Sequence, residues 1–169
     1  MTLRNEKTLD DLSWQILREL QKDARLSYSE LGRRVGLSAP SVAERVRRLE
    51  EAGVIVGYKA HIELANIGLP ITAFIRLRCT LGKCLLNTAG IENYPEIREV
   101  HKVSGRHCTL LRVAAASVRH LDVLADKFSR HGEVEMEVVL SSPLPDRDVD
   151  WEKGLESLEP ATEFRWDKK

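Results

Sequence analysis

The first third of the chain spaces its apolar residues as helices do, whereas much of the remainder alternates apolar with polar positions. Residues 8–24 place leucine and isoleucine three or four positions apart, which predicts a helix. A second, short helix is expected after Ser27, because Ser27 and Glu30 have the spacing of a capping box and Gly36 follows the last apolar position. Two helices are therefore predicted before residue 36.

A third helix is expected from Ser38, which can cap it, to a stop at Gly53. Its apolar stripe consists of Val42, Val46 and Leu49. This arrangement predicts a helix-turn-helix, whose second helix enters the DNA major groove, although a plain three-helix unit with a solvated arginine face has the same periodicity. Arg45 lies beside the stripe and could form a salt bridge within the helix or a groove contact. The candidates opposite the stripe are Ser41, Glu44, Arg47 and Arg48.

The second half of the chain predicts a small domain of alternating strands and helices. Residues 71–80 alternate strictly between two faces, as a half-buried strand does. Helices are expected over 83–94 and 117–131. Further strands are expected over 97–103, 108–114 and 134–140. The resulting order, βαββαβ, is that of a ferredoxin-like sandwich with both helices on one face of the sheet.

The other face of this sheet should need a partner. Phe74 lies on it, and a bare apolar sheet face is an aggregation hazard. We therefore expect a homo-oligomer in which Phe74 and the strand over 134–140 are buried against a second subunit.

Composition adds a charge asymmetry. The chain has 169 residues, with 26 basic and 26 acidic side chains, but residues 132–169 carry five basic against eleven acidic residues. Residues 1–60 carry eleven basic against nine acidic residues, which is compatible with a polyanionic partner. There is no run of about 18 apolar residues and no leader pattern, so we expect a cytoplasmic protein that does not enter the membrane.

Cysteine and histidine spacing gives little sign of a metal site. No C-x₂-C pair occurs, and the H-x₅-H pair His101 and His107 flanks a predicted turn, where polar rim residues are expected. A zinc site would have to be assembled across strands or chains, and we expect no metal and no cofactor. Cys79 and Cys84 are expected to be buried as small hydrophobic residues. There is no phosphate loop, dinucleotide fingerprint or catalytic signature, so an enzyme is the weakest hypothesis.

The string ELGRRVGLSAPSVAERVRRLEEAGVIVGY, residues 30–58, resembles the helix-turn-helix of the Lrp/AsnC family of transcription regulators, including a hinge strand with the pattern I-x-G-Y. The resemblance implies a winged-type helix-turn-helix domain that binds double-stranded DNA. The residues it places at the DNA are Tyr28, Ser29, Arg33, Ser38, Ala39, Pro40, Ser41, Ala43, Glu44, Arg45, Arg47 and Arg48.

The string EVHKVSGRHCTLLRV, residues 99–113, is similar to the turn between the second and third strands of the family's effector domain, and residues 137–145 resemble its closing strand. The resemblance implies a domain for effector binding and oligomerisation. Its dimers associate further, commonly into octamers, and an amino acid or related small metabolite binds near the turn. The candidate effector-binding residues are Ser104, Gly105, Arg106, His107 and Cys108.

Arg106 stands where many family members have an acidic residue after the glycine. A guanidinium suits a carboxylate or phosphate and repels an ammonium group, so we expect an anionic metabolite in preference to a neutral amino acid. Alternatively, Arg106 points to solvent or pairs with an acidic residue of a neighbouring chain.

The sequence thus predicts an α+β protein with four parts. A helix-turn-helix domain spans residues 1–60, a linker 61–68, a ferredoxin-like effector and oligomerisation domain 69–143, and an acidic tail 144–169, in which Asp150 could cap a short helix. The expected function is that of a sequence-specific DNA-binding transcription regulator responsive to a small metabolite. The alternatives are an architectural DNA-binding protein without an effector, and an effector-domain protein or small enzyme without salt-dependent DNA affinity.

Overall fold

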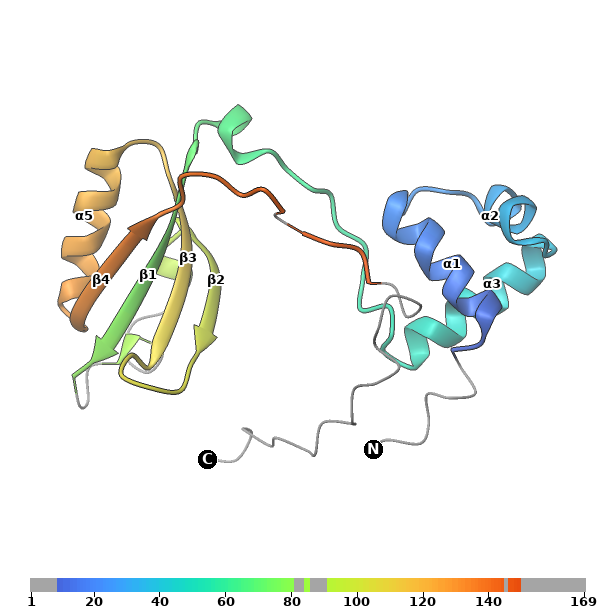
Figure 1. Cartoon of the computed structure of the whole chain (residues 1–169), viewed down its shortest axis with the longest axis horizontal. Coiled ribbons are helices and arrows are strands. Elements are labelled where there is room, and N and C mark those ends of the chain that lie inside the picture. The colour runs from blue at the N-terminus through green and yellow to red at the C-terminus, as the bar shows by residue number, and fades with distance from the viewer. Residues whose placement is uncertain (1–8, 81–83, 86–90, 145, 150–169) are drawn as a thin grey trace. The chain divides into compact units, whose positions relative to one another are not determined.

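The computed structural model describes residues 9–80, 84–85, 91–144 and 146–149 (Figure 1). The described residues up to Ala60 form one unit together with those from Leu144 onward, and residues His61–Pro143 form a second. Within these described ranges, no helix is long and apolar enough to cross a membrane.

The first unit is built around three helices. They are α1 (Asp11–Lys22), α2 (Tyr28–Val35) and α3 (Ala39–Glu51). Their N-caps are Asp10, Ser27 and Ser38, whose side chains each accept a hydrogen bond from the backbone N–H three residues further on. Gly36 ends α2 with a left-handed φ of 72°, which glycine adopts without steric cost. The three predicted helices are thereby confirmed.

The predicted apolar stripes meet in one core. Its buried members come from all three helices: Ile16, Leu20, Leu31, Val35, Val42, Val46 and Leu49. Burying a side chain of this size contributes about 1.5–3 kcal/mol, so this core is the main force that holds the helices together.

Two local expectations for this unit are wrong. Glu30 does not complete the capping box, because its carboxylate is turned to Arg33 at 2.7 Å and Arg34 at 3.0 Å. The hinge strand and wing are also absent from the described residues 52–60, which contain no strand. A strand needs a hydrogen-bonded neighbour, and the described part of this unit offers none.

The segment that returns from the second unit also contacts α1. The side chain of Gln21 donates to the carbonyl of Val149 at 3.0 Å and accepts from the backbone N–H of Val149 at 2.7 Å. The helix expected after Asp150 lies outside the described residues.

The second unit is a four-stranded antiparallel sheet in the order β2-β3-β1-β4. The strands are β1 (Ile71–Cys79), β2 (Ile97–Lys102), β3 (Thr109–Ala115) and β4 (Gly132–Val138). Helix α5 (Val118–Ser129) precedes β4, and short 3₁₀ turns occupy Leu64–Ile67 and Ile91–Asn93. The ferredoxin-like order of strands is confirmed. Half of the helix expected over 83–94 lies outside the described residues, and at its end Ile91–Asn93 form a 3₁₀ turn in place of an α-helix.

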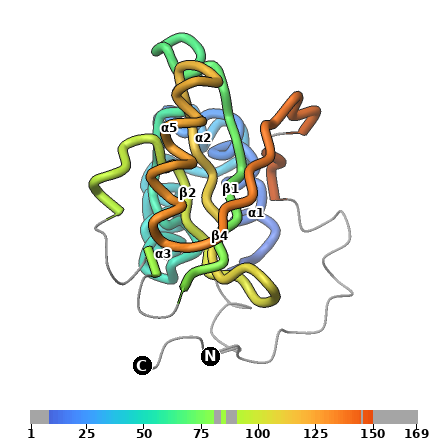
Figure 2. Tube along the Cα trace, turned by 90° about the vertical axis from the view of Figure 1, so that its left-hand side faces the viewer, coloured from blue at the N-terminus to red at the C-terminus, as the bar shows by residue number. Residues whose placement is uncertain are grey.

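Helix α5 covers one face of this sheet (Figure 2). Ala73, Ile75 and Leu77 on β1 point to that face and are fully buried, as their alternation predicts. They pack with Leu85, Leu111, Val113, Ala115, Leu121, Leu124 and Phe128. Leu85 thus fixes the chain just after β1 against the same core.

The opposite face is charged, which corrects the expectation of a bare apolar surface. Val134 and Met136 of β4 pack into the helix-covered core, so the glutamates between them face the open side. Three ion pairs cross this face: Arg76–Glu137 at 2.8 Å, Arg78–Glu133 at 3.4 Å and Arg112–Glu99 at 2.5 Å. Phe74 is a half-buried apolar residue among them.

Candidate DNA-binding and effector sites

The turn between α2 and α3 depends on a close backbone approach. The N–H of Leu37 donates to the carbonyl of Gly32 at 2.9 Å, and a Cβ at position 32 would lie 2.4 Å from the carbonyl oxygen of Leu37. Gly32 therefore lets the start of α3 fold tightly against α2, which sets the angle at which α3 is presented.

Helix α3 presents a polar face opposite its buried stripe. Val42, Val46 and Leu49 are at most 1% exposed, as the spacing predicts. Eight of the residues predicted to contact DNA are exposed: Tyr28, Ser29, Arg33, Ser38, Pro40, Ser41, Arg47 and Arg48. The half-buried ones are Ala39, Ala43, Glu44 and Arg45. The exposed set spans α2 and the start and outer face of α3.

Glu44 organises the two arginines of this face. Its carboxylate accepts from Arg47 at 2.8 and 3.0 Å and from Arg48 at 2.8 Å, and Arg47 also binds Glu51. Hydrogen bonds from Arg47 and Arg48 hold the pKa of Glu44 at about 2, so the carboxylate stays charged. A phosphate contact by Arg47 would therefore compete with two carboxylate partners, whereas Arg48 binds Glu44 through Nε alone and keeps further N–H donors for a phosphate. Glu44 itself can accept from a cytosine amino group.

Arg45 neither forms a salt bridge within its helix nor points outward from it. Its Nη1 lies 2.7 Å from both carboxylate oxygens of Asp10 and 3.2 Å from the Ser13 hydroxyl, so it joins α3 to the N-cap of α1. Its side chain is 28% exposed. We infer a structural role for Arg45 in place of groove contact.

The predicted effector residues form the turn between β2 and β3. The N–H of Val103 donates to the carbonyl of Cys108 at 3.1 Å and closes the turn, and Gly105 has a φ of 112° that favours glycine. Ser104, Gly105 and Arg106 are exposed, whereas His107 and Cys108 are half-buried.

Two basic side chains of this turn reach the acidic residues of β4. Arg106 Nη2 lies 3.2 Å from Glu133, which also pairs with Arg78. His107 Nε2 lies 3.3 Å from a carboxylate oxygen of Glu135, without the geometry of a hydrogen bond. Arg106 thus pairs with an acidic residue of its own chain. The sequence feature that could have predicted these acidic partners is the alternation of glutamates in β4.

A cluster of three cysteines was not foreseen from sequence. The sulfurs of Cys79, Cys84 and Cys108 all lie within 4.8 Å of one another, and each residue is half-buried, not fully buried as small hydrophobes would be. The sequence feature that could have predicted the cluster is the position of the cysteines near the ends of predicted strands. A search for metal-binding motifs within one short segment does not take such positions into account.

Comparison with known proteins places both units. Residues 9–50 match the AsnC-type helix-turn-helix domain, and residues 72–149 match the Lrp/AsnC ligand binding domain. The chain is 40% identical to the uncharacterized HTH-type transcriptional regulator YezC of Bacillus subtilis, covering 79% of this chain and 95% of the relative.

Solved structures agree with these matches. The structure of Bacillus subtilis LrpC is similar at a TM-score of 0.76 with 31% identity, over 82% of this chain and 99% of that one. A transcriptional regulator of Neisseria meningitidis, NMB0573, crystallised as an L-Met complex, is similar at a TM-score of 0.75 with 27% identity, over 84% of this chain and 96% of that one. These are families of regulators and not of enzymes, and the chain belongs to the Lrp/AsnC family of HTH-type transcriptional regulators, with a DNA-binding helix-turn-helix and a ligand-binding domain.

Proposed function

We propose that this chain regulates transcription by sequence-specific binding of double-stranded DNA through α3, under the control of a small metabolite that binds beside the β2–β3 turn. The observation that carries the DNA-binding part is the outer face of α3. Ser41, Arg47 and Arg48 are exposed opposite a fully buried stripe, on a helix whose angle is fixed by a glycine turn.

The Glu44 ion pairs give this face selectivity. Arg47 is held by Glu44 and Glu51, so a nonspecific phosphate must compete there with existing partners. Arg48 keeps N–H donors beyond its Nε contact with Glu44. Glu44 also repels phosphates that approach the helix without a compensating contact. A DNA sequence that offers a hydrogen-bond donor to Glu44 would compensate for this repulsion.

Arginine substitutions test the DNA-binding part. We expect Arg47→Ala and Arg48→Ala each to weaken operator binding and, where the contact is to phosphate, to lower the salt slope by about one. A base contact would cost about 1–3 kcal/mol at one position of the site. Arg119→Ala, which removes an exposed arginine of α5, is the matched control. Unchanged affinity in both α3 variants, measured by fluorescence anisotropy over a salt series, would contradict the assignment.

The effector part is supported by the geometry of the turn. The exposed backbone of Ser104 and Gly105 can approach a ligand closely because Gly105 lacks a Cβ. The side chain of Arg106 is 62% exposed, and the contact of its guanidinium with Glu133 leaves further N–H donors for an anion. An anionic metabolite is therefore the proposed ligand, in preference to a neutral amino acid such as the methionine named for the Neisseria relative.

Calorimetry separates these ligand classes. We expect a small carboxylate or phosphate metabolite to bind the wild type and to bind Arg106→Ala at least tenfold more weakly. Micromolar binding of leucine or methionine, unaffected by Arg106→Ala, would overturn the anionic proposal. DNA binding that no ligand in the panel alters would favour the architectural alternative.

A further inference from the structure

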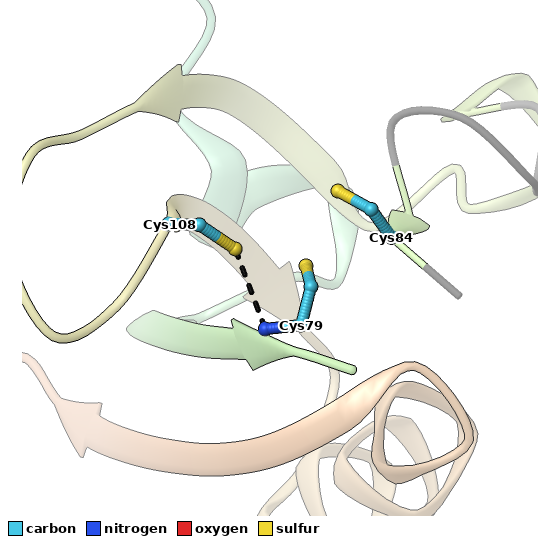
Figure 3. A group of neighbouring side chains, drawn as sticks. All are labelled: Cys79, Cys84 and Cys108. Atoms are coloured by element: carbon cyan, nitrogen blue, oxygen red, sulfur yellow. Dashed lines mark hydrogen bonds between the residues drawn. The ribbon is translucent and has the colours of Figure 1, made fainter. Parts of the chain in front are cut away.

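The three cysteines of the second unit come from three separate segments and converge on one point (Figure 3). Cys79 is the last residue of β1, Cys108 directly precedes β3, and Cys84 directly precedes Leu85. Figure 3 shows the three side chains directed toward a shared space. The fold, and not a local motif, therefore assembles this group.

Backbone contacts fix the two strand cysteines. The N–H of Cys108 donates to the carbonyl of Leu77 at 3.0 Å, and the N–H of Cys79 donates to the Cys108 sulfur at 3.3 Å. Cys84 is held by its neighbour Leu85, which is fully buried in the core. Cys79 and Cys108 are thus carried by hydrogen-bonded backbone, and Cys84 is next to a buried core residue, which suits a preorganised ligand set.

The spacing suits a metal ion bound to sulfur. With metal–sulfur bonds of about 2.3 Å, three thiolates around one ion lie about 4 Å apart in a trigonal plane, and slightly closer in a tetrahedral site. The observed limit of 4.8 Å is within one ångström of that value, so rotation of the side chains would close the group.

The donor set indicates the class of metal. Thiolate sulfur selects soft and borderline ions such as Cu(I) and Zn(II) over Mg(II) or Ca(II). Within the described part of the chain, the group comprises three cysteines without a histidine or carboxylate. A three-coordinate ion, or one that keeps an exchangeable fourth position, fits such a set.

We propose that Cys79, Cys84 and Cys108 form a binding site for a single thiophilic metal ion, Cu(I) or Zn(II), at the end of β1 beside the β2–β3 turn. Binding releases the thiol protons to solvent and forms three metal–sulfur bonds, with no change in oxidation state. The site shares Cys108 with the candidate effector-binding residues of the turn, and it does not depend on the proposed DNA contacts. Because Cys108 ends the turn, an ion there would also link the turn to Cys84.

Metal titration of the full-length, reduced protein tests this site. Zn(II) is titrated in competition with a chromophoric chelator, and Cu(I) is titrated without oxygen in competition with bicinchoninate. We expect one equivalent of one of these ions to bind and to protect all three thiols from alkylation by iodoacetamide. Cys84→Ser and Cys108→Ser should each weaken metal binding by about 100-fold. The loss of a residue that only supports a metal ligand already costs about 10- to 100-fold, and these substitutions remove a ligand itself.

His101→Ala, which removes an exposed histidine from the same domain, should leave the affinity unchanged. Thiolate-to-cobalt charge-transfer absorption of the wild type with Co(II) provides a readout that needs no variant, should a substitution prevent folding. The proposal is overturned if neither Zn(II) nor Cu(I) protects the thiols, or if binding persists in the cysteine variants and is lost in His101→Ala.

Discussion

Asp10 has two roles that a single carboxylate can combine. It caps α1 through the N–H of Ser13 and pairs with Arg45 of α3. Partial burial acts to raise the pKa of Asp10, but hydrogen bonds from Ser13 and Arg45 outweigh it and hold that pKa at about 2. Because the pKa is lowered on folding, the carboxylate stabilises the fold above about pH 4 and ceases to do so as the pH falls through 2.

We expect Asp10→Ala to destabilise the protein by about 1–2 kcal/mol, because it removes both the cap and the ion pair. Arg45→Ala should cost about 1 kcal/mol or less, since the pair is partly exposed to solvent. Urea unfolding of the two variants and of Lys22→Ala, an exposed control at the end of α1, measures these effects. A stable Arg45→Ala variant with weakened DNA binding would instead assign Arg45 to the DNA contact.

Glu96 provides a second pH-dependent contact, between the start of β2 and α5. It is 9% exposed, and its Oε1 lies 3.0 Å from His120 Nε2 and 3.9 Å from Lys127 Nζ. The N–H of Ala116 donates to His120 Nδ1, so Nε2 carries the proton that Glu96 accepts.

The sign of the Glu96 effect follows from its pKa. Burial acts to raise the pKa of Glu96, but its own backbone N–H, His120 and Lys127 lower it below the ordinary value. The carboxylate therefore stabilises the fold above about pH 4.3, and this contribution is lost as the pH falls through the lowered value. We expect Glu96→Gln to cost about 1–2 kcal/mol at pH 7 and clearly less at pH 3, in urea unfolding at both pH values. An equal cost at the two pH values would show that shape, and not charge, is what Glu96 supplies.

At the scale of elements, periodicity and capping residues were sufficient to predict those helices and strands that pack against other parts of the same chain. The helices after Ser27 and Ser38 and the strand over 71–80 were predicted because their apolar faces are buried in their own domain. The predicted hinge strand is absent, because its sequence pattern favours an extended backbone but does not identify a neighbouring strand to form hydrogen bonds with. The cysteine cluster and the Arg106–Glu133 pair depend on register between strands distant in sequence, which no local spacing reveals.

Gly32 gives the sharpest test of an element. Alanine favours a helix over glycine by about 1 kcal/mol, so Gly32→Ala would stabilise α2 in isolation. Its Cβ would, however, lie 2.4 Å from the Leu37 carbonyl oxygen, which is backbone and cannot rotate away. We expect the clash to prevail, with a loss of about 2 kcal/mol or more in thermal unfolding and weaker DNA binding. Ser29→Ala, in the first turn of the same helix, should leave thermal unfolding nearly unchanged, and a stabilised Gly32→Ala would show that the turn opens easily.

At the scale of the whole molecule, we predict that assembly occurs through the open face of the sheet. The register sets Phe74 between Arg112 of β3 and Glu137 of β4, so an apolar ring is surrounded by paired charges. Such a face suits a two-fold contact in which rings stack at the centre and charges form the rim. It remains our prediction that two copies of this chain associate through it.

Sedimentation velocity at micromolar concentration should accordingly show a dimer or a larger even-numbered species. Phe74→Glu should shift the protein toward the monomer, because it adds an unpaired charge at the centre of the contact while leaving the helix-covered core unchanged. Val123→Glu is the matched control, since Val123 is 46% exposed on α5, which covers the other face of the sheet. A wild-type monomer would refute the assembly. An oligomer that persists in Phe74→Glu but dissociates in Val123→Glu would place the contact on α5. The ion pairs of Arg76, Arg78 and Arg112 would then lie on the protein surface and contribute little to stability.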